Sequence, residues 1–121
     1  MRYSKTRINK YRNNKVTYKG IEFDSKKEFQ RYLVLADMQK NNEIEYLELQ
    51  PKFLLLKKYK DNQGVTEREV NYIADFMYIK NGRVYVEDVK SKITKKDSTY
   101  ILKRKLFKQN YPDYYFIENV M

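Results

Sequence analysis

The Asn81-Gly82 pair constrains the fold of this chain more than any other short feature. It separates two segments, 68–80 and 83–90, whose Val, Ile, Tyr and Phe content is typical of β-strands. Asn-Gly between two such segments favours a two-residue hairpin loop, because both residues readily adopt a positive φ. The sequence therefore predicts two adjacent antiparallel strands, with Lys80 and Arg83 as the closing pair of the hairpin.

The hairpin register brings two aspartates together. Counting back from the closing pair places Asp75 directly opposite Asp88, and opposed residues share a face with Cβ atoms about 4.5–5.5 Å apart. Lys90 lies two residues beyond Asp88 and shares that face, whereas Glu87 points to the other face. We therefore expect two carboxylates and one ammonium group to meet on one face of the sheet.

Two carboxylates this close need a shared proton or a cation, because like charges in that position destabilise a sheet. Most of their neighbours in the sequence are apolar, and a divalent metal with oxygen ligands would satisfy the pair. An adjacent lysine would suit the stabilisation of a phosphoryl centre and the positioning of a water. The alternative is that both aspartates are solvated strand residues on an open face.

Composition removes several classes of enzyme. The chain has no cysteine and no histidine, which excludes a Cys or His zinc site, a Ser-His or Cys-His nucleophile and a His general base. The lack of cysteine also leads us to expect a cytoplasmic protein, and no apolar run is long enough for a membrane span. Chemistry must come from carboxylates, Lys, hydroxyl groups or a metal held by oxygen.

The net charge of +10 is concentrated in two segments. Residues 1–20 carry seven Lys/Arg and no acid, and residues 90–108 carry eight Lys/Arg and one acid. Such clusters favour a nucleic-acid partner over a merely lysine-rich surface, although a solvated helix face explains Lys103, Arg104 or Lys105, each taken alone, about as well. The candidate DNA-binding residues are Lys5, Arg7, Lys10, Arg12, Lys15, Ser91, Lys92, Lys103, Arg104 and Lys105.

The remaining elements follow from periodicity and turn residues. We expect a flexible basic arm over 1–16 and a single domain over 17–121 that opens with a short hairpin or extended stretch. A helix should begin at Ser25 and end near Asn41, with an apolar stripe that includes Leu33. One strand is expected over 44–60, then a turn over 61–64.

The strand pair 68–80 and 83–90 comes next, followed by a helix over 95–110 capped by Thr94 or Asp97, with Leu102 in its stripe. A last strand is expected over 114–117. The predicted fold is α/β (α+β), with a mixed central sheet flanked by helices.

Four segments together resemble the PD-(D/E)xK nuclease superfamily, specifically a family of small phage-encoded proteins within it. That family is similar to phage endonuclease I-type Holliday-junction resolvases and to the transposon end-cleaving endonuclease subunit. Two positions depart from the pattern: Ala74 replaces the proline before the aspartate, and Asp88 replaces the usual glutamate. The segments are Gly20-Ile21-Glu22-Phe23-Asp24-Ser25-Lys26-Lys27-Glu28, Leu49-Gln50-Pro51-Lys52-Phe53, Tyr72-Ile73-Ala74-Asp75-Phe76 and Val86-Glu87-Asp88-Val89-Lys90.

The resemblance implies a restriction-endonuclease-like αβββαβ core and a site in which Glu28 joins Asp75, Asp88 and Lys90. Asp75, Asp88 and Glu28 would hold Mg²⁺ or Mn²⁺, and Gln50 would support the site. Glu28 is also the third residue after Ser25 in a capping box, so a purely structural role stays open. The resemblance further implies a homodimer in a bacterial host cell.

Charge and resemblance together predict a metal-dependent DNA endonuclease. Its substrate would be duplex or branched DNA, including Holliday junctions. Contacts should be dominated by phosphate and shape, since few base-reading features are visible. The alternatives are a non-catalytic DNA-binding module with a nuclease fold, and an RNA-acting protein.

Overall fold

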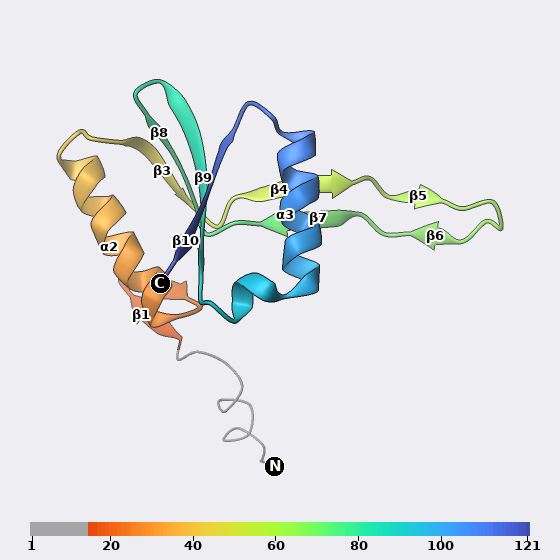
Figure 1. Ribbon diagram of the computed structural model, residues 1–121, viewed down its shortest axis with the longest axis horizontal. Helices are drawn as coiled ribbons and strands as arrows, with labels where there is room; N and C mark the ends of the chain where they lie inside the picture. Colours follow the sequence, from red (N-terminus) through yellow and green to blue (C-terminus); the bar gives the residue numbers. More distant parts are fainter. Residues whose placement is uncertain (1–14) are drawn as a thin grey trace, which may run out of the picture.

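The computed structural model describes residues 15–121, which form a mixed α+β fold around a four-stranded sheet. The strand order is β10-β9-β8-β3, with β10 parallel to β9 and the other neighbours antiparallel. Helices α2 and α3 lie on either side of this sheet (Figure 1). The predicted mixed sheet flanked by helices is confirmed. The bounds are α2 Lys26–Lys40, β3 Glu45–Leu49, β8 Phe76–Lys80, β9 Arg83–Lys90, α3 Ser98–Asn110 and β10 Tyr115–Val120.

A short hairpin precedes α2, as expected. Strand β1 (Val16–Tyr18) pairs with β2 (Ile21–Phe23), and Val16 is the partner of Phe23. The folded region therefore includes Val16, which the sequence had assigned to the basic arm. The candidate DNA-binding residues Lys5, Arg7, Lys10 and Arg12 lie outside the described residues.

Two expected strands are each broken into pieces. The segment 44–60 forms β3, β4 (Lys52–Leu56) and β5 (Tyr59–Lys60), and the segment 68–80 forms β7 (Val70–Ile73) and β8. The first break falls at Gln50, whose φ of 52° is incompatible with a continuous strand. The second lies beside it, since the Gln50 N–H donates to the Asp75 carbonyl (2.9 Å) and the Ala74 N–H to the Pro51 carbonyl (3.0 Å). Both segments of the chain therefore leave the main sheet at the same point.

Beyond that point the two segments form a separate two-stranded ribbon. Strand β4 pairs with β7, and the ribbon continues through β5 and β6 (Thr66–Glu67) past α3 as a projecting hairpin (Figure 1). At its tip Asp61 Oδ1 accepts hydrogen bonds from the N–H groups of Gln63 and Val65, both at 2.9 Å. The predicted turn over 61–64 is therefore confirmed.

The Asn81-Gly82 hairpin forms as predicted. Both loop residues have a positive φ, of 52° and 75°. The register runs from Lys80 opposite Arg83 to Phe76 opposite Glu87, and β9 occupies the predicted residues 83–90.

The helix caps are those the sequence allowed, but one residue of each predicted apolar stripe is exposed. The Ser25 hydroxyl caps α2, and Asp97 rather than Thr94 caps α3, because Thr94 begins a short 3₁₀ turn, η1 (Thr94–Lys96). Leu33 and Leu102 were expected in the apolar stripes, yet they are 42% and 59% exposed. No helix within residues 15–121 has the length and apolar character needed to cross a membrane.

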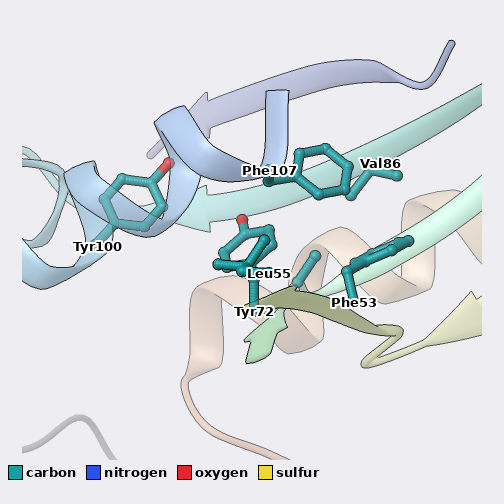
Figure 2. Packing of buried hydrophobic residues seen from close by; sticks show 7 residues of the cluster. Phe53, Leu55, Tyr72, Val86, Tyr100 and Phe107 are labelled. Carbon is teal, nitrogen blue, oxygen red and sulfur yellow. The ribbon is translucent and has the colours of Figure 1, made fainter. Parts of the chain in front are cut away.

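Two apolar clusters fill the two sides of the sheet. One lies under α2, and the other lies between α3, the β4–β7 ribbon and β9 (Figure 2). Alternation along β9 sends neighbouring residues into different clusters, which is why residues 86 and 87 face opposite helices. The first cluster contains Leu35, Ile44, Phe76 and Tyr78, and the second contains Phe53, Leu55, Tyr72, Ala74, Val86, Tyr100 and Phe107.

Candidate functional site

Asp75 lies between β7, which ends in the ribbon at Ile73, and β8, which begins in the main sheet at Phe76. Regular pairing ends with Phe76 opposite Glu87, one residue before the predicted Asp75–Asp88 pair. The Asp75 N–H instead donates to the Glu87 carbonyl at 3.2 Å, and Asp75 Oδ2 accepts from the Val89 N–H at 2.7 Å. The side chain is therefore held against β9 by backbone groups, although it lies outside the ladder.

Asp75 and Asp88 line the same cavity, and each acts on the pKa of the other. Burial, followed by the charge of Asp88, raises the pKa of Asp75 to about 8. Burial also raises the pKa of Asp88, although hydrogen bonding with Asp75 and the positive charge of Lys90 act in the opposite direction. With Asp88 buried and Asp75 half-buried, a carboxyl pair of this kind retains a proton near neutral pH unless a cation replaces it.

Lys90 lies on the face of Asp88, as the strand periodicity predicted. Its Nζ is 3.8 Å from Asp88 Oδ1 and stands 4.5 Å from the centre of the Tyr100 ring. The ammonium group is thus held between a carboxylate and an aromatic face, two surroundings that both favour a cation. This arrangement keeps a positive charge beside the acid pair.

Glu28 reaches the same site from the first turn of α2. Its side chain is buried, and burial followed by the charges of Asp75 and Asp24 raises its pKa to about 7. Hydrogen bonds from the Asp24 backbone and from the Gln50 side chain act in the opposite direction. The Glu28 backbone N–H donates to the Ser25 hydroxyl at 3.1 Å, so Glu28 takes part in the helix cap and its carboxyl group also lines the site.

These side chains line an open cleft. A cavity of about 650 Å³ is bordered by Glu28, Gln50, Asp75, Asp88 and Lys90, together with residues of β2. A smaller one of about 150 Å³ shares three of them and extends toward Ser91 and Thr94. The predicted catalytic residues and the supporting Gln50 therefore lie around one cleft.

Glu87 points to the opposite face, as predicted, and is fully enclosed there. The Arg31 guanidinium donates to both of its oxygens, at 2.5 and 3.0 Å. The Tyr78 hydroxyl (2.9 Å) and the Asn119 amide (3.0 Å) also donate to it. The Glu87 side chain thus joins α2, β8, β9 and β10, and these side-chain hydrogen bonds are made on the face of the sheet opposite the cleft.

Residues 8–119 match the family described as "Protein of unknown function (DUF1064)". The chain belongs to the DUF1064 family. No curated protein and no solved structure matches it. The chemistry of this DUF1064 protein must therefore be argued from the residues of its cleft.

The donor atoms of the DUF1064 cleft fit a hard divalent cation. Asp88 Oδ1 is buried without a hydrogen-bond partner among residues 15–121, and an unpaired buried oxygen of this kind is costly. No group of three or more His, Cys, Asp or Glu residues in the described chain is arranged to hold a metal. Two carboxylates, Asp75 and Asp88, are sufficient for Mg²⁺, which usually retains several waters, and Glu28 adjoins Asp75.

The basic residues predicted to bind DNA are divided by the structure. Lys103 lines a cavity of about 270 Å³ together with Lys90, so it borders the site. Arg104, the next residue, is paired with Glu118 at 3.4 Å. Lys105 is exposed.

The other candidate DNA-binding residues within the described chain, Ser91, Lys92 and Lys15, also differ in whether they border the cleft or are paired. Ser91 lines the smaller cavity, and its hydroxyl accepts from the Thr94 N–H at 3.0 Å. Lys92 is exposed beside it. Lys15 lies within 4.0 Å of Glu22 and 3.9 Å of Asp24, two acids that offset its charge.

Sequence reasoning missed two tyrosines. The Tyr72 hydroxyl donates to Asp88 Oδ2, and Tyr100 lies under the Lys90 ammonium group. Tyr72 lies in the predicted strand 68–80, in the part that the structure places in the β4–β7 ribbon, and Tyr100 lies in α3. Tyr72 lies only three residues before Asp75, but its approach to Asp88 depends on the break between β7 and β8, which the sequence pattern did not show.

Proposed function

We propose that this DUF1064 protein is a metal-dependent endonuclease that hydrolyses phosphodiester bonds in DNA. The observation that carries the proposal is the pair of half-buried Asp75 and buried Asp88, with the Lys90 ammonium 3.8 Å from Asp88, all lining an open cleft. Such a pair without a cation must keep a proton, which is unfavourable for the fold at neutral pH. A function that uses a divalent cation explains why the pair is placed there.

The order of the elements supports the proposal. With the β1–β2 hairpin and the ribbon from β4 to β7 set aside, the chain runs α2, β3, β8, β9, α3, β10. This is the αβββαβ order expected for the restriction-endonuclease-like core. The acid pair and Lys90 stand at the end of β9 and at the start of β8, where the strand pair separates from the ribbon.

In the proposed reaction each residue has a separate task. Asp75 and Asp88 would hold one or two Mg²⁺ or Mn²⁺ ions, assisted by Glu28. A bound ion supplies positive charge to the scissile phosphate. Lys90 would orient the attacking water and stabilise charge on the phosphoryl group, and Gln50 would keep Glu28 in place by hydrogen bonding.

The distribution of positive charge supports a nucleic acid as substrate. Lys90 and Lys103 line adjoining cavities, and exposed Lys92 follows Lys90 directly. A phosphate backbone crossing Lys90 would meet Lys103 on one side and Ser91 on the other. Binding through such contacts should weaken steeply with salt, because bound cations are released from the nucleic acid.

Cleavage assays test the proposal directly. The parent protein and Lys90→Met are incubated with branched, duplex and single-stranded DNA and with RNA, in Mg²⁺, in Mn²⁺ and in EDTA. We expect cleavage of DNA by the parent only when a metal is present, and a loss of about 100-fold or more in Lys90→Met. Lys40→Met, which changes an exposed lysine in the last turn of α2 that is not among the candidate DNA-binding residues, is the matched control. Absence of metal-dependent cleavage on every substrate would refute the enzyme.

One observation favours a second candidate, a non-catalytic nucleic-acid-binding module with the same fold. Within residues 15–121 three acidic side chains do not converge on one point. This candidate predicts salt-sensitive DNA binding without cleavage in any metal, and the same assays separate it from the enzyme. Cleavage confined to RNA would instead identify an RNA-acting protein.

The family resemblance also implies a homodimer, which sedimentation in solution tests.

A further inference from the structure

The two carboxylate oxygens of Asp88 have different surroundings. Oδ2 accepts a hydrogen bond from the Tyr72 hydroxyl. Oδ1 has no hydrogen-bond partner within residues 15–121, and Lys90 Nζ is 3.8 Å from it. One oxygen is therefore held by the protein, and the other is buried beside the Lys90 ammonium group without a hydrogen-bond partner among the described residues.

Tyr72 is well placed to hold that oxygen. It stands on β7 with its hydroxyl directed away from the ribbon, and it is only 3% exposed (Figure 2). Its ring packs on Phe107 and Phe116, with centroid separations of 5.4 and 6.5 Å. Because these rings belong to α3 and β10, packing in the core fixes the position of the Tyr72 hydroxyl.

We propose that Tyr72 is a positioning residue that makes Asp88 a one-oxygen ligand, so that the cleft takes a single divalent cation. The inference rests on the proposed function and adds to it how the acid pair is oriented. Asp75 is held in a similar way, since its Oδ2 accepts from the Val89 N–H at 2.7 Å. Each carboxylate thus has one oxygen engaged by the protein, which disfavours a pair of bridged ions.

The opposite face of β9 provides a matched control. Tyr78 is also 3% exposed, and its hydroxyl donates to Glu87 Oε1 at 2.9 Å. Glu87 makes its side-chain hydrogen bonds away from the cleft. Tyr78→Phe therefore removes the same hydroxyl, at the same burial, from the carboxylate next to Asp88.

The experiment measures Mn²⁺ binding by the full chain, without any substrate. Free Mn²⁺ is followed by electron paramagnetic resonance for the parent, Tyr72→Phe and Tyr78→Phe. We expect one Mn²⁺ per chain in the parent and an affinity within about twofold of it in Tyr78→Phe. Tyr72→Phe should bind about tenfold or more weakly, because loss of a partner behind a metal ligand typically costs 10–100-fold. Unfolding in EDTA should show a similar, modest loss of stability in both variants.

Several results would overturn the inference. One is a Mn²⁺ affinity of Tyr72→Phe close to that of the parent, and another is an equal loss of Mn²⁺ affinity in Tyr72→Phe and Tyr78→Phe. The binding of two Mn²⁺ ions by the parent, or loss of the fold in Tyr72→Phe alone, would also overturn it. Failure of the proposed function has a different signature. In that case the parent and both variants would all fail to bind Mn²⁺, and the inference would fall with the metal site.

Discussion

Asp75→Asn should make the metal-free protein more stable. The folded-state pKa of Asp75, about 8, lies above its ordinary value of 3.8, so this carboxyl destabilises the fold progressively as pH rises between those two values. At about pH 7 the unfolded chain has lost the proton that the folded chain retains, which costs at most about 4 kcal/mol at about 1.4 kcal/mol per pH unit. Asparagine keeps the shape of the side chain and removes this cost.

We expect a gain of about 2–4 kcal/mol in the free energy of unfolding near neutral pH, or about 10 °C in Tm for a domain of this size. Part of the gain is lost because the amide is a weaker acceptor than a carboxylate for the Val89 N–H. The assay is thermal unfolding in EDTA at about pH 7 and about pH 4, where the unfolded carboxyl is also protonated and the gain should largely disappear.

Two controls make this test specific. Asp113→Asn changes an exposed aspartate before β10 and should leave Tm nearly unchanged. Added Mg²⁺ should stabilise the parent and not Asp75→Asn, since a ligand that binds only the folded state raises its stability. The reasoning is wrong if Asp75→Asn is less stable than the parent at about pH 7, or if its gain is as large at about pH 4.

Three further predictions concern the rest of the site and its support. Because Glu28 has a pKa of about 7 and must lose its proton to bind a cation, Mn²⁺ affinity should rise through that pH in the parent and less so in Glu28→Gln, as calorimetry can measure. Arg31→Met leaves Glu87 buried without its cation and should cost about 3–5 kcal/mol in urea unfolding, and a change below about 1 kcal/mol would contradict a buried ion pair. Phe107→Ala opens a cavity in the fully buried core of α3 and should cost about 3–5 kcal/mol by the same assay, whereas Leu102→Ala, on the exposed side of the same helix, should cost far less.

Local rules were sufficient for elements whose limits are set by backbone geometry. Asn81-Gly82 sets its hairpin because both residues accept a positive φ, and the register of β8 and β9 follows from the loop length alone. Ser25 similarly sets the start of α2 through its side-chain bond to the Glu28 N–H. The burial of particular helix residues was less predictable, because Leu33 is apolar but the sheet lies under a different side of the helix.

The sequence by itself determined the places of the two helices and of the β8–β9 hairpin, the face shared by Asp88 and Lys90, and the opposite direction of Glu87, because these follow from helical and strand periodicity and a two-residue turn. Only the tertiary structure decided that the strand pairs β3–β8 and β4–β7 separate at Gln50 and Asp75, which opens the cleft. That break depends on contacts between segments far apart in the chain. It also brings Tyr72 and the first turn of α2 to the acid pair, so the surroundings of that pair are a property of the fold.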